Sequence, residues 1–304
     1  MLAYYCYRRI FYAASKKKDR PIKLPSGEQY LSGRDKMLAL IDEMSAIPFE
    51  QVYTTSFDGL KLAARYYHVK DGAPVHIQFH GYKGWACRDF CGGNKMARER
   101  GCNTLVVDQR AHGKSEGNTI SMGINERFDC LSWVKYICDR FGNDVKIVIS
   151  GVSMGATTVL MAAELDLPDN VIGIIADCPY SSPKEIIMKV GRDMKLPMKL
   201  LYPLVKLGAK LYGHFDLEAA DAAEAADHAK VPVLLIHGED DRFVPCSMST
   251  KIYDTFKSAN PEGDIIFETF PGAGHGISFM EDEARYGMLV DRALNLMEER
   301  SRHD

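Results

Sequence analysis

The sequence contains no long apolar run, no C-x-x-C pair of cysteines and no large excess of one charge, and each absence excludes a class of protein. A formal net charge of −3 over 304 residues gives no reason to expect a polyanionic partner such as nucleic acid. The eight cysteines are scattered, which favours reduced thiols in a cytoplasmic protein over a disulfide framework. The remaining composition, with 46% hydrophobic and 26% charged residues, is that of a soluble globular protein.

Motifs for nucleotides and metals are also missing. Gly113 and Gly117 are not followed by G-K-[ST], and no G-x-G-x-x-G motif opens a helix, so no phosphate-binding loop is expected. His76 and His80 share one face of a predicted strand, but no third ligand has a spacing suitable for zinc. We therefore expect neither an organic cofactor nor a metal ion.

The N-terminal segment allows two interpretations. Residues 1–15 are rich in aromatic side chains, contain Arg8-Arg9 and are followed by Lys16-Lys17-Lys18. The apolar run is too short and too charged to span a bilayer, and no small-residue cleavage site follows it. The segment is either an amphipathic helix packed on the rest of the protein or a contact with a membrane surface through residues 1–20. A cytoplasmic protein, with membrane association at the N-terminus as the alternative, is expected.

One stretch carries the strongest signal of chemistry. The β-branched run over 145–149 predicts a buried strand, and it leads into Gly151-Val-Ser-Met-Gly155, a G-x-S-x-G motif followed by a good helix former. A serine on so sharp a turn has a strained backbone, so the flanking glycines must lack a Cβ to let strand and helix approach. Ser153 is the predicted nucleophile, and the helix behind it would direct N–H groups at an oxyanion.

Strand and helix signals alternate along most of the chain. The predicted helices include 37–46, one with Phe128, Leu131, Val134 and Ile137 on one face, and 285–300. Asp58-Gly59 separates the first two predicted strands and is a hairpin signal. Predicted strands cover 51–57, 60–69, 75–81, 103–110, 145–149, 171–179, 233–238 and 264–270. This alternation predicts an α/β fold with a mostly parallel central sheet covered by helices on both faces.

The alternation of predicted strands and helices stops between residues 180 and 230, where the sequence is helical in character and apolar. This stretch separates two strands whose ends should flank the site, so we expect an inserted helical cap lined by adaptable side chains such as methionine. The predicted organisation is an N-terminal helical extension over 1–50, a core formed by 51–179 and 231–304, and the cap over 180–230.

The other parts of the predicted site follow later strands. His275 lies among glycines after the last strand, where it has no core to pack into, and it is the predicted base. Asp240 and Asp241 follow the preceding strand, while Asp177 ends an earlier one, so the acid has three candidates. The predicted oxyanion donors are two backbone N–H groups. Met154 follows the nucleophile, and Tyr82 lies in the loop after the third strand.

Five ordered motifs resemble the α/β-hydrolase superfamily, more narrowly the small bacterial hydrolases of the cinnamoyl-esterase and serine-aminopeptidase-like branch. The motifs are His80-Gly-Tyr82, Asp108-Gln-Arg-Ala-His-Gly-Lys-Ser115, Gly151-Val-Ser-Met-Gly155, His237-Gly-x-x-Asp241-x-x-Val-Pro245 and Gly274-His-Gly276. In that family the acid stands four residues after the histidine of His-Gly, which implies Asp241 rather than Asp240. The cap is the most variable part of these proteins, so the resemblance implies no particular substrate.

These observations predict a serine hydrolase, in first place a carboxylesterase that cleaves small to medium acyl or aryl esters through Ser153, His275 and Asp241. The expected partner is a small-molecule ester, and the apolar cap favours an acyl or aryl group over a charged one. A peptidase or amidase, a thioesterase and an acyltransferase would use the same three residues and stay open. A non-catalytic homologue that binds a small ligand is the alternative from a different class.

Overall fold

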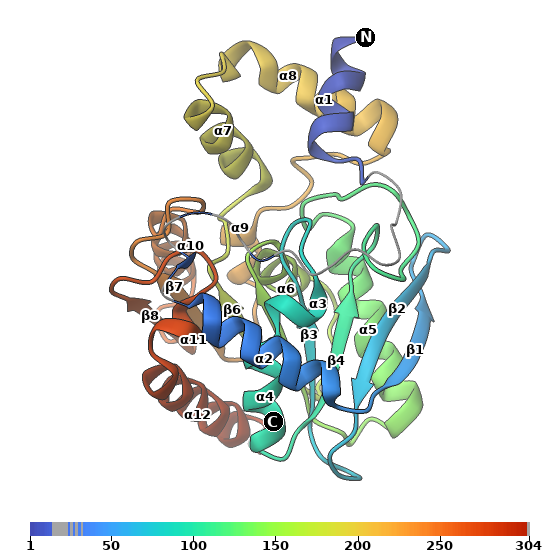
Figure 1. Cartoon of the computed structure of the whole chain (residues 1–304), viewed down its shortest axis with the longest axis vertical. Coiled ribbons are helices and arrows are strands. Elements are labelled where there is room, and N and C mark those ends of the chain that lie inside the picture. Colours follow the sequence, from blue (N-terminus) through green and yellow to red (C-terminus); the bar gives the residue numbers. More distant parts are fainter. Residues whose placement is uncertain (14–23, 25–26, 28–29, 32, 303–304) are drawn as a thin grey trace.

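An eight-stranded sheet forms the centre of the protein in the computed structural model, which describes residues 1–13, 24, 27, 30, 31 and 33–302 (Figure 1). The strand order is β1-β2-β4-β3-β5-β6-β7-β8. The strands are β1 (Glu50–Thr55), β2 (Lys61–Tyr67), β3 (Val75–Phe79), β4 (Asn103–Asp108), β5 (Ile147–Val152), β6 (Val171–Asp177), β7 (Val233–Gly238) and β8 (Ile265–Phe270). The six strands from β4 to β8 in this order run parallel, and β2 runs antiparallel to both of its neighbours, β1 and β4. The predicted mostly parallel sheet is thus confirmed.

The predicted hairpin joins β1 and β2. The Ser56 N–H donates to the Leu60 carbonyl at 2.9 Å, and the Ser56 hydroxyl donates to Asp58 at 2.6 Å. Gly59 has φ +86°, a conformation that L side chains rarely adopt. The Asp-Gly dipeptide therefore fixes the turn that the sequence predicts.

Helices cover both faces of the sheet, because successive side chains of a strand point to opposite faces. Ile147 and Ile149 of β5 belong to one core cluster, whereas Val148 belongs to the other. The first cluster includes buried side chains of α5 (Glu126–Phe141), α6 (Met154–Ala162) and α10 (Ser247–Ala259). The second includes side chains of α2 (Arg34–Ala46), α3 (Ala86–Asp89), α4 (Cys91–Glu99) and α12 (Glu283–Arg300). The short α11 (Ser278–Glu281) precedes α12. Burial of both faces explains why the parallel strands are almost continuously apolar.

The apolar face predicted for α5 is only partly the face that the structure buries. Val134 and Ile137 are fully buried as expected, but Phe128 and Leu131 are only half-buried. Cys130 and Trp133 occupy the buried positions of the preceding turn instead. The Phe128 ring contacts the tilted ring of Phe57 in the hairpin loop, with 4.9 Å between the ring centres, and lies under the Arg127 guanidinium. Its apolar surface is therefore covered outside the core.

Four helical segments connect β6 to β7, in the stretch where the sequence predicts a cap. They are α7 (Pro183–Asp193), α8 (Met198–Gly208), the π-helical turn η2 (Ala209–Gly213) and α9 (Ala222–Ala226). Ser182 caps α7 by accepting the Glu185 N–H, and proline occupies the first helical position, where no N–H is needed. Figure 1 shows α7 and α8 at the top of the molecule, away from the main body, whereas α9 packs against α6 and α10. The exact division of the chain at residues 180 and 230 stays a prediction.

The N-terminal helix α1 (Leu2–Ile10) packs against α8 and η2 through Ala3, Cys6 and Tyr7. The packed amphipathic helix, one of the two interpretations of this segment, is therefore what the structure shows for residues 2–10. The predicted membrane contact of residues 1–20 lies partly outside the described residues. Within the described part of the chain, no helix combines the length and the apolarity needed to cross a bilayer.

Candidate active site

Ser153 occupies the sharp turn between β5 and α6. Its backbone has φ 56° and ψ −118°, a positive-φ conformation that residues other than glycine rarely adopt. A Cβ on Gly151 would lie 2.1 Å from the carbonyl carbon of Gly155, and one on Gly155 would lie 1.8 Å from the carbonyl oxygen of Phe79. Glycine is therefore required at both positions, as the sequence predicts. The turn places Ser153 at the carboxyl edge of the sheet, where ligands of parallel sheets bind.

His275 connects Ser153 with Asp241, so the structure brings together the three residues predicted for the chemistry. His275 Nε2 lies 2.9 Å from Ser153 Oγ, and His275 Nδ1 lies 2.6 Å from Asp241 Oδ2. When Nδ1–H donates to the carboxylate, Nε2 is left as an acceptor for the serine proton. Such an arrangement allows an imidazole to act as a base toward a hydroxyl group.

Backbone and side-chain donors hold the Asp241 carboxylate in place. Its Oδ1 accepts the N–H groups of Phe243 and Val244, each at 2.8 Å, and His237 Nε2 lies 3.3 Å from Oδ2. Burial by itself would raise the pKa of Asp241, but the hydrogen bonds from His237 and His275 outweigh it and hold the pKa well below its ordinary value. Asp241 is therefore ionised and can stabilise a positive charge on His275.

The two other candidate acids occupy different positions. Asp240 is exposed, and its N–H donates to the Ala273 carbonyl at 3.0 Å. Asp177 is buried, and its Oδ2 accepts the Tyr286 hydroxyl at 3.1 Å. Asp241, the residue that the family resemblance implies, is thus the acceptor of the His275 Nδ1 hydrogen bond.

The two backbone groups predicted as oxyanion donors lie close to Ser153 along the chain or in space. Met154 is the first residue of α6, where N–H groups have no acceptor within the helix. The loop after β3 passes beside the serine, since a Cβ on Gly81 would lie 3.4 Å from Ser153 Cβ. The side chain of Tyr82 points elsewhere, because its hydroxyl donates to the Ile10 carbonyl at the end of α1.

Hydrogen bonds on both sides fix this loop after β3. His80 Nδ1 lies 2.8 Å from the Gly81 carbonyl, and His80 Nε2 accepts the Gln109 N–H at 3.1 Å. His80 therefore shapes the turn, and both of its ring nitrogens are occupied. Asp89 accepts the Gly81 N–H at 2.9 Å and is itself held by Arg88 at 2.6 Å. Asp89 belongs to no recognisable sequence motif, so the sequence does not predict it as a site residue.

A second buried histidine also escapes sequence reasoning. In the sequence, His237 is recognisable only as the first residue of a His-Gly motif. In the structure its Nδ1 lies 2.6 Å from the Ser249 hydroxyl, and its Nε2 lies 2.8 Å from the Val244 carbonyl. These contacts anchor the loop that carries Asp241 to β7 and α10, so His237 is a positioning residue for the acid.

Asp177 allows a prediction about stability, because burial raises its pKa from the ordinary value of an aspartate to about 6, against the opposing effects of His237 and Tyr286. Near pH 4 the folded chain is protonated there and the unfolded chain about half protonated, so the two states still differ little in free energy. As the pH rises from 4 to 6, the unfolded chain releases this proton first, so folding loses up to about 3 kcal/mol. We expect Asp177→Asn to raise the free energy of unfolding at pH 8 by up to that amount.

Denaturant unfolding of Asp177→Asn at pH 4 and pH 8 tests this expectation. The gain should be present at pH 8 and small at pH 4, and the Tyr286 hydroxyl can still donate to the asparagine oxygen. Asp169→Asn, at an exposed position, is the matched control and should show no such difference. Equal effects of Asp177→Asn at the two pH values would contradict the raised pKa.

One set of atoms could in principle hold a metal ion. Cys178, Asp241 and His275 each offer a ligand atom, and these atoms lie within 4.8 Å of one another. Burial raises the pKa of the Cys178 thiol well above its ordinary value, whereas a metal requires the thiolate. His275 Nδ1 and Asp241 Oδ2 are already hydrogen-bonded to each other. The donor set therefore fits proton transfer better than metal binding.

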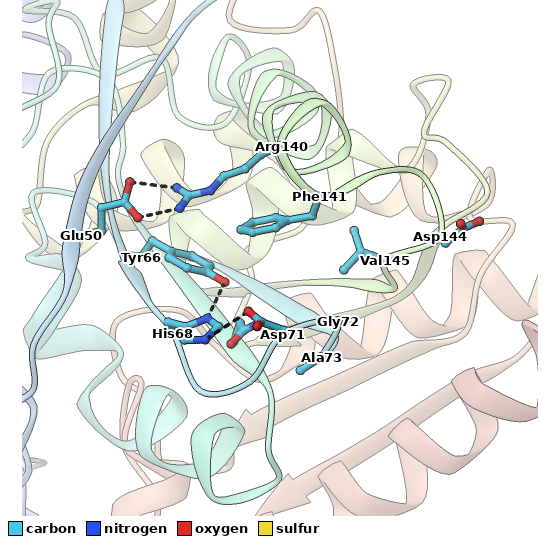
Figure 2. Close-up of a pocket in the computed structure, with 11 residues that line it drawn as sticks. Glu50, Tyr66, His68, Asp71, Gly72, Ala73, Arg140, Phe141, Asp144 and Val145 are labelled. Atoms are coloured by element: carbon cyan, nitrogen blue, oxygen red, sulfur yellow. Dashed lines mark hydrogen bonds and ion pairs between the residues drawn. The ribbon is translucent and has the colours of Figure 1, made fainter.

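Two surface cavities lie at the opposite edge of the sheet from Ser153. The first, of about 360 Å³, is lined by residues near the amino ends of β3 and β5, including Ala73 and Val145 (Figure 2). Two pairs of its side chains interact: Arg140 binds Glu50 at 2.6 Å, and His68 lies 3.5 Å from Asp71. The second, of about 510 Å³, lies near the starts of β6 and β7 and is lined by Val171 and Pro232. Neither cavity includes a predicted site residue, and their position at the amino edge argues against a role in the chemistry.

Comparisons with known proteins agree with this fold. The sequence model of the prolyl oligopeptidase family matches residues 96–295. The chain is 30% identical to the uncharacterized protein YqkD of Bacillus subtilis over 65% of this chain and 63% of that protein. It is 24% identical to the bifunctional esterase/perhydrolase DCH of Acinetobacter calcoaceticus over 76% of this chain and 95% of that protein. The chain therefore spans less than two thirds of the length of YqkD.

Solved structures give the same picture of the architecture. The esterase Pf2001 of Pyrococcus furiosus superposes with a TM-score of 0.68 at 22% sequence identity, covering 93% of this chain and 98% of that one. At this level of identity the likeness shows the α/β-hydrolase fold alone.

Proposed function

Since the chain belongs to the prolyl oligopeptidase family and has the α/β-hydrolase fold, we propose that it is a serine hydrolase, and specifically a carboxylesterase for small to medium acyl or aryl esters. The observation that carries the proposal is the position of His275, which lies 2.9 Å from Ser153 Oγ and 2.6 Å from Asp241 Oδ2. The free cysteines, all at buried or half-buried positions, favour a cytoplasmic location.

The proposed reaction proceeds through an acyl-enzyme. Ser153 Oγ attacks the ester carbonyl while His275 Nε2 takes the hydroxyl proton, and Asp241 stabilises the imidazolium that forms. The N–H groups of Met154 and Tyr82 bind the negative oxygen of the tetrahedral intermediate. His275 then gives the proton to the leaving alcohol. Water, activated by the same imidazole, releases the acid and restores Ser153.

An ester with an apolar acyl or aryl group suits the side chains near His275. The Phe243 ring meets the His275 ring edge to face at 5.1 Å and remains partly exposed, so it offers an apolar surface beside the base. Lys189 of α7 donates to the Arg242 carbonyl, which ties the predicted cap to the loop that carries Asp241. The esterase named among the relatives supports the choice of an ester over an amide.

A peptidase that grips a substrate amine would need a free carboxylate in the cap region. Two carboxylates of the predicted cap, Glu218 and Asp221, are engaged within the chain. Glu218 accepts the Tyr202 hydroxyl at 3.0 Å and pairs with Lys206, and Asp221 caps α9 by accepting the Ala223 N–H at 2.8 Å. These contacts favour the ester over the peptide substrate.

Hydrolysis of p-nitrophenyl esters from acetate to decanoate tests the proposal. We expect turnover with an optimum at short to medium acyl chains, and stoichiometric labelling of Ser153 by a fluorophosphonate. An alanine p-nitroanilide is the parallel amide substrate and should react far more slowly. Labelling without ester turnover would point to a peptidase or an acyltransferase. Neither labelling nor turnover would contradict the hydrolase proposal and favour a non-catalytic binding protein.

Asp89 provides a separate prediction about the oxyanion loop. Asp89→Ala removes the acceptor of the Gly81 N–H, so the Tyr82 N–H is less well oriented. Because loss of a whole oxyanion donor costs about 100-fold or more in kcat, we expect this indirect change to lower kcat by roughly tenfold and KM much less. Asp89→Asn keeps an acceptor oxygen and should recover most of kcat. A fall in thermal stability with unchanged kcat would assign Asp89 a purely structural role.

A further inference from the structure

Helix α8 is apolar on two opposite faces. Met198, Tyr202 and Val205 are spaced at i, i+4 and i+7, and all three are buried. Leu200, Leu207 and the adjoining Leu211 of η2 lie on the other side and are 74, 43 and 52% exposed. A helix with an apolar stripe on its outer face exposes surface that in most soluble proteins would be covered. The outer stripe therefore indicates an interaction surface.

The N-terminal helix extends this surface. A Cβ on Gly208 would lie 2.5 Å from the Ala3 carbonyl oxygen, which shows how closely α1 and α8 pack. The exposed rings of Tyr4 and Tyr212 meet at 5.0 Å, and Leu2 of α1 is also exposed. Figure 1 shows α1 and α8 together at one end of the molecule. We call the exposed apolar side chains of α1, α8 and η2 the outer cap surface.

Basic residues accompany the outer cap surface. Residues 1–13 and 194–214 contain six lysines and arginines and no aspartate or glutamate, although the whole chain has a net charge of −3. These residues are Arg8, Arg9, Lys195, Lys199, Lys206 and Lys210. Lys206 pairs with Glu218, whereas Lys199 and Lys210 are exposed and lie on one flank of the leucine stripe. The positive charge is thus concentrated beside the exposed leucines.

From this combination we propose that the outer cap surface binds a lipid membrane that carries anionic headgroups. Exposed leucine and tyrosine side chains enter the boundary between headgroups and acyl chains, and the lysines and arginines contact the anionic lipid. Two hydrogen bonds fix α1, which carries part of this surface, to the core. The Tyr82 hydroxyl donates to the Ile10 carbonyl, and the Tyr7 hydroxyl lies 2.7 Å from the Thr119 hydroxyl. This inference does not depend on the proposed ester hydrolysis.

Vesicle sedimentation tests the proposal with the full chain. We expect wild type to sediment with vesicles of phosphatidylcholine and phosphatidylglycerol, and about tenfold less with phosphatidylcholine alone. Added salt should weaken the binding, since it screens the charges. Leu200→Glu combined with Leu207→Glu should reduce binding about tenfold or more. Ser153→Ala should bind like wild type, which separates this test from that of the catalytic proposal.

The matched control introduces two glutamates at exposed apolar positions far from the outer cap surface. Leu38 of α2 and Met288 of α12 are 42 and 66% exposed, and Figure 1 shows both helices in the lower part of the molecule. Leu38→Glu combined with Met288→Glu changes the net charge equally and should leave vesicle binding intact. No binding by wild type, or an equal loss in both double variants, would overturn the proposal. A wild-type dimer in light scattering that the Leu200→Glu, Leu207→Glu variant dissociates would assign the surface to a second copy and also overturn it.

Discussion

Ser153→Ala is expected to lower kcat for p-nitrophenyl ester hydrolysis by about 10⁴-fold or more. The reason is that the substitution removes the only atom of the proposed site that attacks the carbonyl, while His275 and Asp241 remain hydrogen-bonded. The backbone N–H groups that would hold the oxyanion are unchanged, so a small residual rate over the uncatalysed reaction should persist. Steady-state kinetics with the best ester of the series measures the loss, and fluorophosphonate labelling should disappear with it.

Ser150→Ala is the control for this prediction. Ser150 lies on the same strand, and its hydroxyl makes one long hydrogen bond, 3.3 Å, to the Ile77 carbonyl. Activity and labelling should stay close to wild type in this variant. If Ser153→Ala kept the wild-type rate, another nucleophile would have to perform the reaction, and the proposed mechanism would be wrong.

The local geometry of the nucleophile turn could be predicted because it depends on sterics that the sequence states directly. Glycine is the only residue type that fits at positions 151 and 155. A Cβ at either position would lie about 2 Å from a backbone atom of Gly155 or Phe79. The order of the later loops could also be predicted, since each follows an apolar run that reads as a strand. The choice of Asp241 over Asp240 needed the family resemblance, because adjacent aspartates in one loop are equivalent by composition.

Other parts of the site depend on contacts between distant segments, which periodicity does not reveal. Asp89 binds the Gly81 N–H from a one-turn helix, and Tyr82 binds the last turn of α1, 72 residues earlier in the chain. The exchange of Phe128 for Trp133 on the buried face of α5 has a similar cause. Both are apolar, and the hairpin loop that covers Phe128 is far away in sequence. Sequence patterns predict which residues are apolar, but tertiary packing decides which apolar residues are buried.

Asp241→Asn is expected to lower kcat by about 10³- to 10⁴-fold while Ser153 and His275 stay in place. Oδ1 of Asp241 accepts two backbone N–H groups at 2.8 Å, so the amide oxygen of asparagine should take that position. The NH₂ group then faces His275 Nδ1 and donates to it. This reverses the hydrogen bond and places the ring proton on Nε2, which can no longer accept the proton of Ser153.

Kinetics of three asparagine variants decide whether Asp241 alone has this role. Asp240→Asn changes the exposed neighbour, which is not the hydrogen-bond partner of His275, and kcat should stay close to that of wild type. Asp177→Asn should retain most of the activity, because the Asp177 carboxyl contacts Tyr286. A large loss in Asp177→Asn together with normal activity in Asp241→Asn would show that the acid lies at the end of β6. Since His275 Nδ1 lies 2.6 Å from Asp241 Oδ2, we expect the loss in Asp241→Asn instead.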